Sequence, residues 1–395
     1  MGLDRIRVRN YRALADVDIA VGSINILFGP NGSGKSTLLD TVYFFRDCAI
    51  RGVELASSQR DHGIGMLWDG SGKDEPIRVE LAAGGVAYGL SFSLTAGRID
   101  PFPGEQLVAS GLDLPLIERA PGSTKASLYH KKVEQATIEL REPEKISLGL
   151  FLDFSRDEEA ARLDSLLHFV RFYHSRSFHL WTLKRSGSES SHQTRLWDSG
   201  KNAWSVLRNV QDKRNLDARY STIMDYMAQA FPAFDGIVLE QTGPSSVYAS
   251  FQEKGLGEPI FASGISDGVI QMLLLLIALF SEGDREAVLL FDEPEVSLHP
   301  WAISVLARAI KHASAQWSKQ VFIATHSPVL ISQFEPRDIL AAQTERGRAR
   351  FDRLSEIEEV QELLEEYAPG SLYMSQAIAP QGRSAATQVM DGDAG

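Results

Sequence analysis

The sequence contains a single cysteine, Cys48, and this scarcity excludes an intramolecular disulfide. With no paired thiols and no signal-like start, we expect a cytoplasmic protein in which Cys48 is a small buried hydrophobic residue. No CxxC or HxxxH spacing occurs, so the sequence gives no support to a metal site built from clustered Cys and His. The longest apolar run, Met272 to Phe280, is far shorter than the roughly 20 residues that span a bilayer, so we expect no membrane partner.

Acidic residues outnumber basic ones, 52 Asp or Glu against 40 Lys or Arg. The net charge of −12 over 395 residues argues against a protein coated all over with nucleic-acid-binding surface, although it allows a local basic patch. Between Arg162 and Arg219, eleven Lys or Arg stand against five Asp or Glu, so this segment carries +6 and the remainder carries −18. Three interpretations stay open: a solvated face, a lid that tracks the phosphates of DNA or RNA, or a surface for an acidic partner protein. Interleaved aromatic residues such as Phe172 and Trp181 favour the second.

The sequence does contain a glycine-rich loop that matches G-x-x-x-x-G-K-[ST] at every required position, Gly29 to Ser36. A predicted strand over 23–28 precedes it, and a predicted helix over 36–49 follows it. Glycines let backbone amides turn inward around phosphates, Lys35 supplies charge to the β- and γ-phosphates, and the Ser36 hydroxyl ligates Mg²⁺. We therefore assign ATP binding to Asn31, Gly32, Ser33, Gly34, Lys35, Ser36 and Thr37.

A second motif follows the apolar strand predicted over 287–291, which ends in Asp292 and Glu293. We predict that Asp292 holds Mg²⁺ through water and that Glu293 polarises the attacking water. Phosphoryl transfer needs this arrangement because it depends on positioning and charge neutralisation. Together with the glycine-rich loop, the pair predicts a Mg²⁺-dependent ATPase in which Lys35 and Glu293 take part in catalysis.

Further stretches resemble the ABC-type ATPase heads of RecF and SMC proteins. Ser263 to Gly268 resembles the ABC signature in its Ser-Asp-Gly form, and Ser266 lies 26 residues before Asp292. Residues 294–300 resemble the dimer-contacting loop of these ATPases, and 323–328 resemble the strand end that carries their switch histidine, here His326. The N-terminal Asn10-Tyr11-Arg12 is similar to the "Asn-Phe-Arg" start of the heads, which adds Arg12 to the expected nucleotide-binding residues.

Within that class, the chain resembles the free-standing prokaryotic AAA-type ATPases of the AbiEii/OLD-like group, whose members often sit in anti-phage defence operons. Residues 366–373 resemble the Tyr-x-x-Gly-x-Leu-Trp ending of members encoded beside a small Toprim-like protein. The resemblance implies an operon-encoded effector, either Toprim-like or a nuclease, controlled by ATP. A RecF-like DNA-binding role in repair or replication is the alternative.

The resemblance also implies a head-to-head homodimer that sandwiches two ATP molecules. Ser266 and Gly268 of one subunit would contact the γ-phosphate bound on Lys35 of the other, and His326 would hold the water with Glu293. Two features depart from the family pattern. Asp267 replaces the first signature glycine, so we expect slow hydrolysis. The glutamine that usually ligates Mg²⁺ has no clear counterpart, and Gln59 and Gln135 are the candidates.

We therefore predict an α/β fold: an ABC-ATPase P-loop core with a central, mostly parallel sheet flanked by helices. An antiparallel β subdomain, including a hairpin over 77–81 and 88–94, and an inserted, mainly helical lid complete it. We place the N-terminal half of the head at 1–95, the inserted and basic lid region at 96–235, and the C-terminal half with signature, Asp292 and His326 at 236–345. An acidic helix and a tail occupy 346–395.

Overall fold

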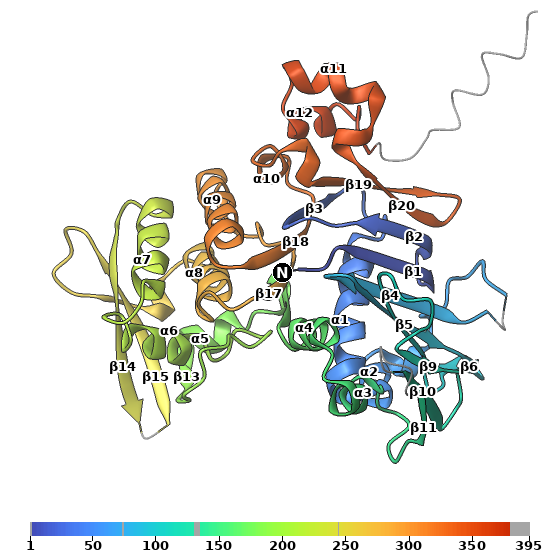
Figure 1. Ribbon diagram of the computed structural model, residues 1–395. Helices are drawn as coiled ribbons and strands as arrows, with labels where there is room; N and C mark the ends of the chain where they lie inside the picture. The colour runs from blue at the N-terminus through green and yellow to red at the C-terminus, as the bar shows by residue number, and fades with distance from the viewer. Residues whose placement is uncertain (1, 73–74, 130–134, 244, 380–395) are drawn as a thin grey trace, which may run out of the picture.

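The computed structural model describes residues 2–72, 75–129, 135–243 and 245–379 (Figure 1). A long helix, α1 (Lys35–Arg51), lies between a six-stranded sheet and an eight-stranded sheet, and its apolar residues pack on both. The predicted class, an α/β ABC-ATPase core with an antiparallel subdomain, is confirmed. The tail predicted beyond 380 lies outside the described residues.

The six-stranded sheet forms the centre of the core. Five of its strands run parallel, and only the last neighbour, β20, is antiparallel. Every residue of β17 and β18 is buried, which is typical of parallel strands covered on both faces and explains their continuous apolar runs. In spatial order the strands are β12 (Val170–His174), β17 (Ala287–Asp292), β18 (Lys319–Thr325), β3 (Ile24–Phe28), β19 (Ile339–Glu345) and β20 (Arg348–Arg353).

Alternation along these strands divides the interior into two cores. In β3, Ile26 and Phe28 pack toward α8 (Asp267–Phe280) and α9 (Pro300–Gln316), whereas Leu27 packs toward α1. Successive strand residues point to opposite faces, so a single strand supplies both cores. The Leu273–Leu276 run of α8 is buried in the first core, as expected for core packing.

The eight-stranded sheet is antiparallel and covers the other side of α1. The hairpin predicted over 77–94 is confirmed as β4 and β5. The sheet continues through residues 104–139, across the boundary that we placed at 95, because alternating buried and exposed residues in β8 and β10 extend one apolar face. Its strands, in spatial order, are β11 (Gln135–Glu139), β10 (Lys125–Tyr129), β9 (Ile117–Arg119), β8 (Gly104–Ala109), β5 (Val86–Phe92), β4 (Ile77–Ala83), β1 (Arg5–Tyr11) and β2 (Leu14–Ala20).

The small elements beside this sheet include a two-stranded ribbon and short helices. The N-terminal strand β1 pairs its basic residues with acids on β2 and β4, as in the bond from Arg7 to Glu80. These small elements are α2 (Val53–Ser58), η1 (Asp61–Gly63), β6 (Leu94–Thr95), β7 (Arg98–Ile99), α3 (Leu148–Ser155) and α4 (Glu158–His168).

A lateral unit lies beyond α8, on the side of the core away from α1 (Figure 1). Two helices of the region predicted as a mainly helical lid, α6 and α7, pack against α8 and a small sheet. The unit consists of η2 (Ser175–Ser177), α5 (Leu180–Arg185), β13 (Ser188–Glu189), α6 (Ala203–Gln211), α7 (Arg219–Ala230), β14 (Phe234–Gly243), β15 (Ser246–Glu253), β16 (Ile260–Phe261) and η3 (Ala262–Gly264).

The C-terminal segment packs near the end of the central sheet. The acidic helix predicted within 346–395 is present as α11 (Glu358–Glu366), and α12 (Pro369–Met374) packs against α10 (Pro328–Ile331). Two short turns, η4 (Pro336–Asp338) and η5 (Leu354–Glu356), complete the chain. Over the described ranges, no helix is long and apolar enough to cross a membrane.

Candidate functional site

The predicted nucleotide residues meet at one edge of the central sheet. β17, β18 and β3 are adjacent and parallel, so their carboxyl ends lie side by side. β3 leads into the glycine-rich loop, β17 ends at Asp292, and β18 ends one residue before His326. The carboxyl edge of a parallel sheet is where α/β proteins bind ligands. Motifs that are up to about 290 residues apart in the sequence thus converge, as the sequence predicted.

The loop from Gly29 to Ser36 needs glycine for two separate reasons. A Cβ on Gly29 would lie 2.0 Å from the carbonyl oxygen of Ala342, so only glycine fits against β19. Gly34 adopts φ 94° in front of α1, a left-handed conformation that other residues rarely take. The loop therefore leads directly into the amino end of α1, whose free amides and dipole favour an anion.

The Lys35 ammonium lies inside the loop. Its Nζ donates hydrogen bonds of 2.9 Å to the carbonyl oxygens of Gly29 and of Pro30. Burial lowers the pKa of Lys35 to about 8, although the nearby carboxylates of Glu293 and Asp292 act in the opposite direction. The side chain thus remains largely protonated at neutral pH, and it is already placed where phosphate oxygens would replace the carbonyl partners.

Ser36 and Asp292 form a pair of oxygen donors. The Ser36 hydroxyl lies 3.1 Å from Oδ1 of Asp292. Two neighbouring ligands of an octahedral Mg²⁺, each about 2.1 Å from the ion, stand about 3 Å apart. The pair could therefore hold the ion directly, whereas the sequence predicted that Asp292 would act through water. Among the described residues no group of three or more His, Cys, Asp or Glu could hold a metal, so phosphate and water oxygens would have to complete the shell.

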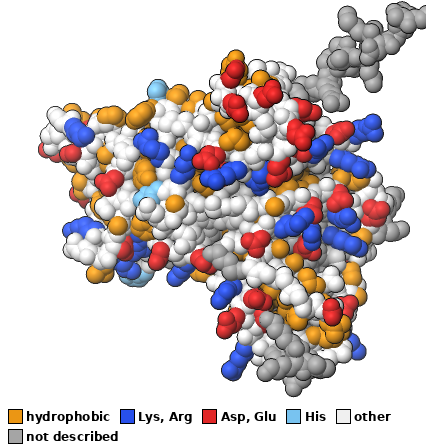
Figure 2. Space-filling model, turned by 45° about the horizontal axis from the view of Figure 1, so that its top comes forward, with side chains coloured by type: hydrophobic (Ala, Val, Ile, Leu, Met, Phe, Trp, Pro, Cys, Tyr) orange, Lys and Arg blue, Asp and Glu red, His pale blue; other side chains and the backbone are white. Residues whose placement is uncertain are grey.

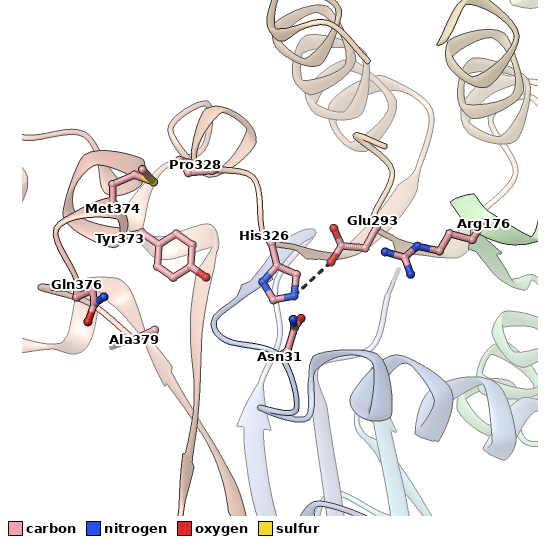
Figure 3. A pocket seen from close by; sticks show the side chains of 9 residues that line it. All are labelled: Asn31, Arg176, Glu293, His326, Pro328, Tyr373, Met374, Gln376 and Ala379. Atoms are coloured by element: carbon pink, nitrogen blue, oxygen red, sulfur yellow. Dashed lines mark ion pairs between the residues drawn. The ribbon is translucent and has the colours of Figure 1, made fainter. Parts of the chain in front are cut away.

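Glu293 and His326 face each other across the mouth of the site (Figure 3). His326 Nε2 lies 3.4 Å from Glu293 Oε1. Burial, followed by the charge and hydrogen bond of Glu295, raises the pKa of Glu293 to about 8, and burial followed by Lys35 lowers the pKa of His326. Glu293 also has φ 53°, a strained value for a residue with a side chain that is common at active sites.

Glu295 connects the two loops that carry this pair. The Thr325 hydroxyl donates a hydrogen bond to Glu295 Oε1, and the backbone N–H of His326 lies 3.4 Å from the same oxygen. The Ser327 N–H in turn donates to the Thr325 hydroxyl. The predicted dimer-contacting loop therefore holds the histidine loop in place, a role that the sequence alone does not assign to Glu295.

Two further residues, which the sequence alone did not predict, reach the site from the end of β12 and from η2, the turn that follows it. His174 Nε2 lies 3.7 Å from Asp292 Oδ2, and its Nδ1 accepts a hydrogen bond from the N–H of Arg176. With Nδ1 assigned as the acceptor, a neutral His174 carries its proton on Nε2, facing Asp292. His174 thus stands beside Asp292, whereas Gln59 and Gln135, the candidates for a glutamine ligand, do not line the cavity over the loop or the one beside it. The sequence signal that could have identified these two residues is the polar end of the short strand 170–174.

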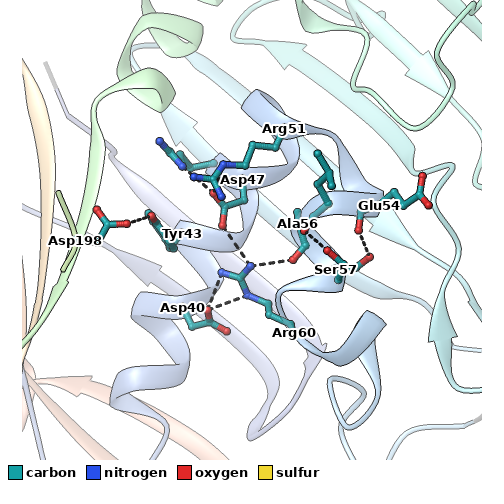
Figure 4. A network of polar contacts seen from close by, with 12 residues as sticks. Asp40, Tyr43, Asp47, Arg51, Glu54, Ala56, Ser57, Arg60 and Asp198 are labelled. Atoms are coloured by element: carbon teal, nitrogen blue, oxygen red, sulfur yellow. Dashed lines mark hydrogen bonds and ion pairs between the residues drawn. The ribbon is translucent and has the colours of Figure 1, made fainter. Parts of the chain in front are cut away.

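Arg12 is held at the site by an acidic residue of α1. Arg12 Nη1 lies 3.0 Å from Asp40 Oδ2, which also accepts a hydrogen bond of 2.6 Å from the Tyr11 hydroxyl. The other oxygen of Asp40 pairs with Arg60, which continues to Asp47 on the same helix (Figure 4). This network holds the β1–β2 turn against α1, so Arg12 is positioned by buried charges.

Two adjoining cavities make up the hollow at this edge of the sheet. The cavity over the loop has a volume of about 420 Å³, and the one beside it about 580 Å³. They share Asn31, Arg176, Glu293 and His326, and the larger one extends to Tyr373 and Met374 of α12. The first is lined by Arg12, Ala13, Asn31, Gly32, Ser33, Gly34, Lys35, Ser36, Thr37, His174, Arg176, Asp292, Glu293 and His326.

The signature residues lie elsewhere. Ser266 caps the start of α8, but its side chain makes no capping hydrogen bond. A Cβ on Gly268 would lie 2.4 Å from the carbonyl oxygen of Ser297, so this glycine permits close contact between α8 and the dimer-contacting loop. Ser266 and Gly268 line neither cavity. A single chain therefore brings together every predicted site residue except these two.

A family comparison agrees with these motifs. The model of the family described as "AAA domain, putative AbiEii toxin, Type IV TA system" matches residues 24–332. The match includes the glycine-rich loop, the signature, Asp292, Glu293 and His326, and it covers most of the chain.

Comparisons with individual proteins give shorter or more distant similarities. The DNA replication and repair protein RecF of Bacteroides thetaiotaomicron is 41% identical over 63 residues, which are 16% of this chain and 17% of RecF. The OLD nuclease of Thermus scotoductus is 42% identical over 40 residues, 10% of this chain and 8% of the nuclease. The matched stretches thus span less than a fifth of either relative. A crystallised SMC head bound to the C-winged helix domain of ScpA has a TM-score of 0.53 at 14% identity and covers 89% of this chain and 97% of that chain, a likeness of fold.

Proposed function

This chain belongs to the AbiEii-type AAA family, an ABC-type ATPase family related to RecF and SMC heads, and on that premise we propose that it hydrolyses Mg²⁺–ATP as a head-to-head dimer. Dimer closure would control a partner effector. The observation that carries the proposal is the convergence of Lys35, Ser36, Asp292, Glu293 and His326 on one cavity, with the signature outside it.

The residues of the cavity divide the reaction between them. The loop amides and Lys35 bind the triphosphate. Ser36 and Asp292 would hold Mg²⁺, which would supply positive charge to neutralise the β- and γ-phosphates. Glu293 accepts a hydrogen bond from the attacking water and then its proton, while His326 orients the water and the γ-phosphate. Glu293 reaches the cavity beside His326, which supports this pairing.

The position of the signature supports the dimer. Ser266 has a hydroxyl that is not used as a helix cap, and it lies at the amino end of α8, where a phosphate would be favoured. Two large aromatic side chains near the signature are exposed: Trp181 on α5 by 67% and Phe261 before η3 by 64%. A second copy of the chain would cover these groups while its ATP meets Ser266.

The C-terminal helices support a link to a partner. Tyr373 of α12 makes an edge-to-face contact with Phe28 of β3 and lines the larger cavity together with His326. Gly370 N donates a hydrogen bond to Ser332, just beyond α10. An effector bound on α11 and α12 would thus sense changes at the γ-phosphate. The matches to the AbiEii-type family and the OLD nuclease support an operon-encoded effector, Toprim-like or a nuclease, and a role in defence.

The test combines phosphate release with a mass measurement. We expect Lys35→Ala to lose at least about a hundredfold in ATP turnover, and Lys213→Ala, an exposed lysine outside the motifs, to match wild type. Glu293→Gln should bind ATP, hydrolyse it poorly and double in mass by light scattering only when Mg²⁺–ATP is present. Normal turnover by Lys35→Ala, or a Glu293→Gln protein that stays monomeric at saturating ATP, would overturn the proposal.

The RecF-like, DNA-binding alternative rests on the basic segment 162–219. Several of its cations pair with acids of the same chain, among them Arg171 with Glu282 and Arg219 with Asp217. On the face drawn in Figure 2, Lys and Arg side chains are interspersed with Asp and Glu and do not gather into one field. Exposed cations such as Lys213 and Arg214 keep the alternative testable.

A further inference from the structure

The signature carries an acid where a phosphate is expected to arrive. Asp267 is the first residue of α8, directly after Ser266 and before Gly268, and its side chain is 58% exposed. At the amino end of a helix a carboxylate stabilises its own helix. The same charge would repel a triphosphate brought to this end by a second protomer.

A cation from another element lies against this acid. Lys184 Nζ is 2.7 Å from Asp267 Oδ1, although the two residues are 83 positions apart. The Lys184 side chain is 20% exposed, so it is more enclosed than its partner. Lys184 thus lies mostly within the protein surface, while more than half of the Asp267 side chain stays open to solvent.

The helix that carries Lys184 is anchored at its carboxyl end. The Tyr248 hydroxyl donates a hydrogen bond to the Lys184 carbonyl, and the buried Trp204 indole donates one of 3.0 Å to the Leu183 carbonyl. The Arg185 guanidinium stacks on Trp181, 5.5 Å from the ring centroid. α5 also contacts η3, the turn that enters the signature. The backbone that carries Lys184 is thus fixed beside the signature, and the ammonium itself is held by Asp267.

Folding alone gives little reason for this pair. Ion pairs with one exposed partner contribute little to stability, and Asp267 already has a favourable place at the start of α8. A fixed cation does matter if a triphosphate must come to the signature, because it removes the net negative charge from the amino end of α8.

We propose that Lys184 is a positioning residue that neutralises Asp267, so that the signature face accepts the ATP bound by a second copy of this chain. The inference rests on the proposed dimer and deepens it. The pair of Lys184 and Asp267 explains how a signature that carries an acid can accept a negatively charged ligand. It also gives one cation of the basic segment a role in nucleotide-dependent assembly.

The experiment measures the dimer dissociation constant in Mg²⁺–ATP in the Glu293→Gln background. Lys184→Met, Asp267→Asn and the double variant are compared, with Arg162→Met as the matched control from an exposed pair with Glu158 in the same segment. Sedimentation velocity at low and high salt provides the constants, and thermal melting without nucleotide reports folding.

We expect Lys184→Met to weaken the dimer at least about tenfold while the melting temperature moves by less than about 2 °C. Asp267→Asn should dimerise as well as the reference, and the double variant should recover to within about threefold of it, because the repulsive charge has gone. Arg162→Met should match the reference. The effect of Lys184→Met should shrink as salt rises, since the charges act near the surface.

Two results would overturn the inference while leaving the dimer intact. One is a Lys184→Met protein that dimerises like the reference. The other is a double variant whose dimer is as weak as that of Lys184→Met, which would mean that Lys184 acts through a group other than Asp267. A reference protein that fails to dimerise at all would instead reject the proposed dimer, and the inference with it. The two failures are therefore distinguishable by the reference alone.

Discussion

His326 Nε2 lies 3.4 Å from Glu293 Oε1, and the two side chains reach the same cavity from the ends of neighbouring parallel strands. Without nucleotide, the pKa of Glu293 is raised to about 8 by burial and by Glu295, so the carboxyl is largely protonated at neutral pH. The site thus holds an acid whose ionisation is costly until positive charge arrives. Mg²⁺ and a completed nucleotide site would reverse that cost, which ties the base to the loaded state.

The first prediction concerns the stability of the nucleotide-free protein. A raised carboxyl pKa means that the folded state binds the proton more tightly than the unfolded state, so stability is lost as pH rises from about 4.5 to about 8. We therefore expect Glu293→Gln to raise the melting temperature relative to wild type. The difference should be near zero at pH 4.5, grow with pH to a few degrees, and level off above pH 8. Scanning calorimetry in EDTA measures it.

The matched control for this prediction is Glu345→Gln, which changes an exposed carboxylate at the end of β19. Its melting temperature should follow wild type at every pH. A Glu293→Gln advantage that is equally large at pH 4.5 and pH 8 would contradict the assigned ionisation.

The second prediction concerns Glu295, which holds the histidine loop through Thr325 and the His326 N–H. We expect Glu295→Gln to lower kcat about tenfold while KM for ATP changes by less than threefold, because the loop that positions His326 loosens and the phosphate cradle does not. Steady-state phosphate release measures both constants. Glu335→Gln, an exposed acid beyond α10, should leave them unchanged. A change confined to KM would place Glu295 in nucleotide binding.

The third prediction concerns Arg176, which lines both cavities beside Glu293 and His326 (Figure 3). A guanidinium here would stabilise charge that builds on the γ-phosphate, so we expect Arg176→Ala to lower kcat by about ten- to a hundredfold. Binding of a non-hydrolysed ATP analogue should weaken less than turnover. Arg176→Lys should recover part of the loss, and Arg214→Ala, an exposed arginine of the same segment, should match wild type. Equal losses in binding and turnover would limit Arg176 to ground-state binding.

The predictable part of the site was local in sequence. The loop 29–36 and the pair Asp292–Glu293 each stand at the end of an apolar strand, so a short stretch of sequence specifies both the turn and its chemistry. His174 ends β12, a strand of five residues between helical segments, and Arg176 lies in the turn just after it. Periodicity does not separate so short a buried run from a helix. Their place beside Asp292 depends on β12 pairing with β17, a long-range pairing that the local sequence does not encode.

The sheet at 104–139 shows the opposite case. β8 and β10 alternate buried and exposed residues, and turns at Gly111 and Gly122 separate the short strands. The sequence pattern that indicates further antiparallel strands was therefore present. The boundary at 95 was placed from the hairpin at 77–94 alone. The approach of Gly268 to Ser297 is different, because only the packed structure shows which carbonyl lies against the glycine.

The last prediction separates folding from nucleic-acid binding in the basic segment. Arg171 makes a bidentate pair with Glu282 at 3.0 and 3.1 Å, and their side chains are only 3% and 10% exposed. Removing one member leaves a buried charge without its partner, which costs about 3–5 kcal/mol, so Arg171→Ala should lower the melting temperature by on the order of 10 °C. Calorimetry measures the shift, and Arg214→Ala should melt like wild type.

Any binding of phosphates by the segment would instead come from exposed cations such as Lys213 and Arg214. Their joint replacement by Glu should leave the melting temperature unchanged and lower the salt slope of DNA or RNA binding by about one for each phosphate that the variant no longer neutralises. Equal salt slopes in the wild type and the double variant would show that these two residues do not neutralise phosphates of the nucleic acid. An Arg171→Ala protein that melts like wild type but no longer binds DNA or RNA would show that Arg171 contacts the nucleic acid and is not needed for the stability of the fold.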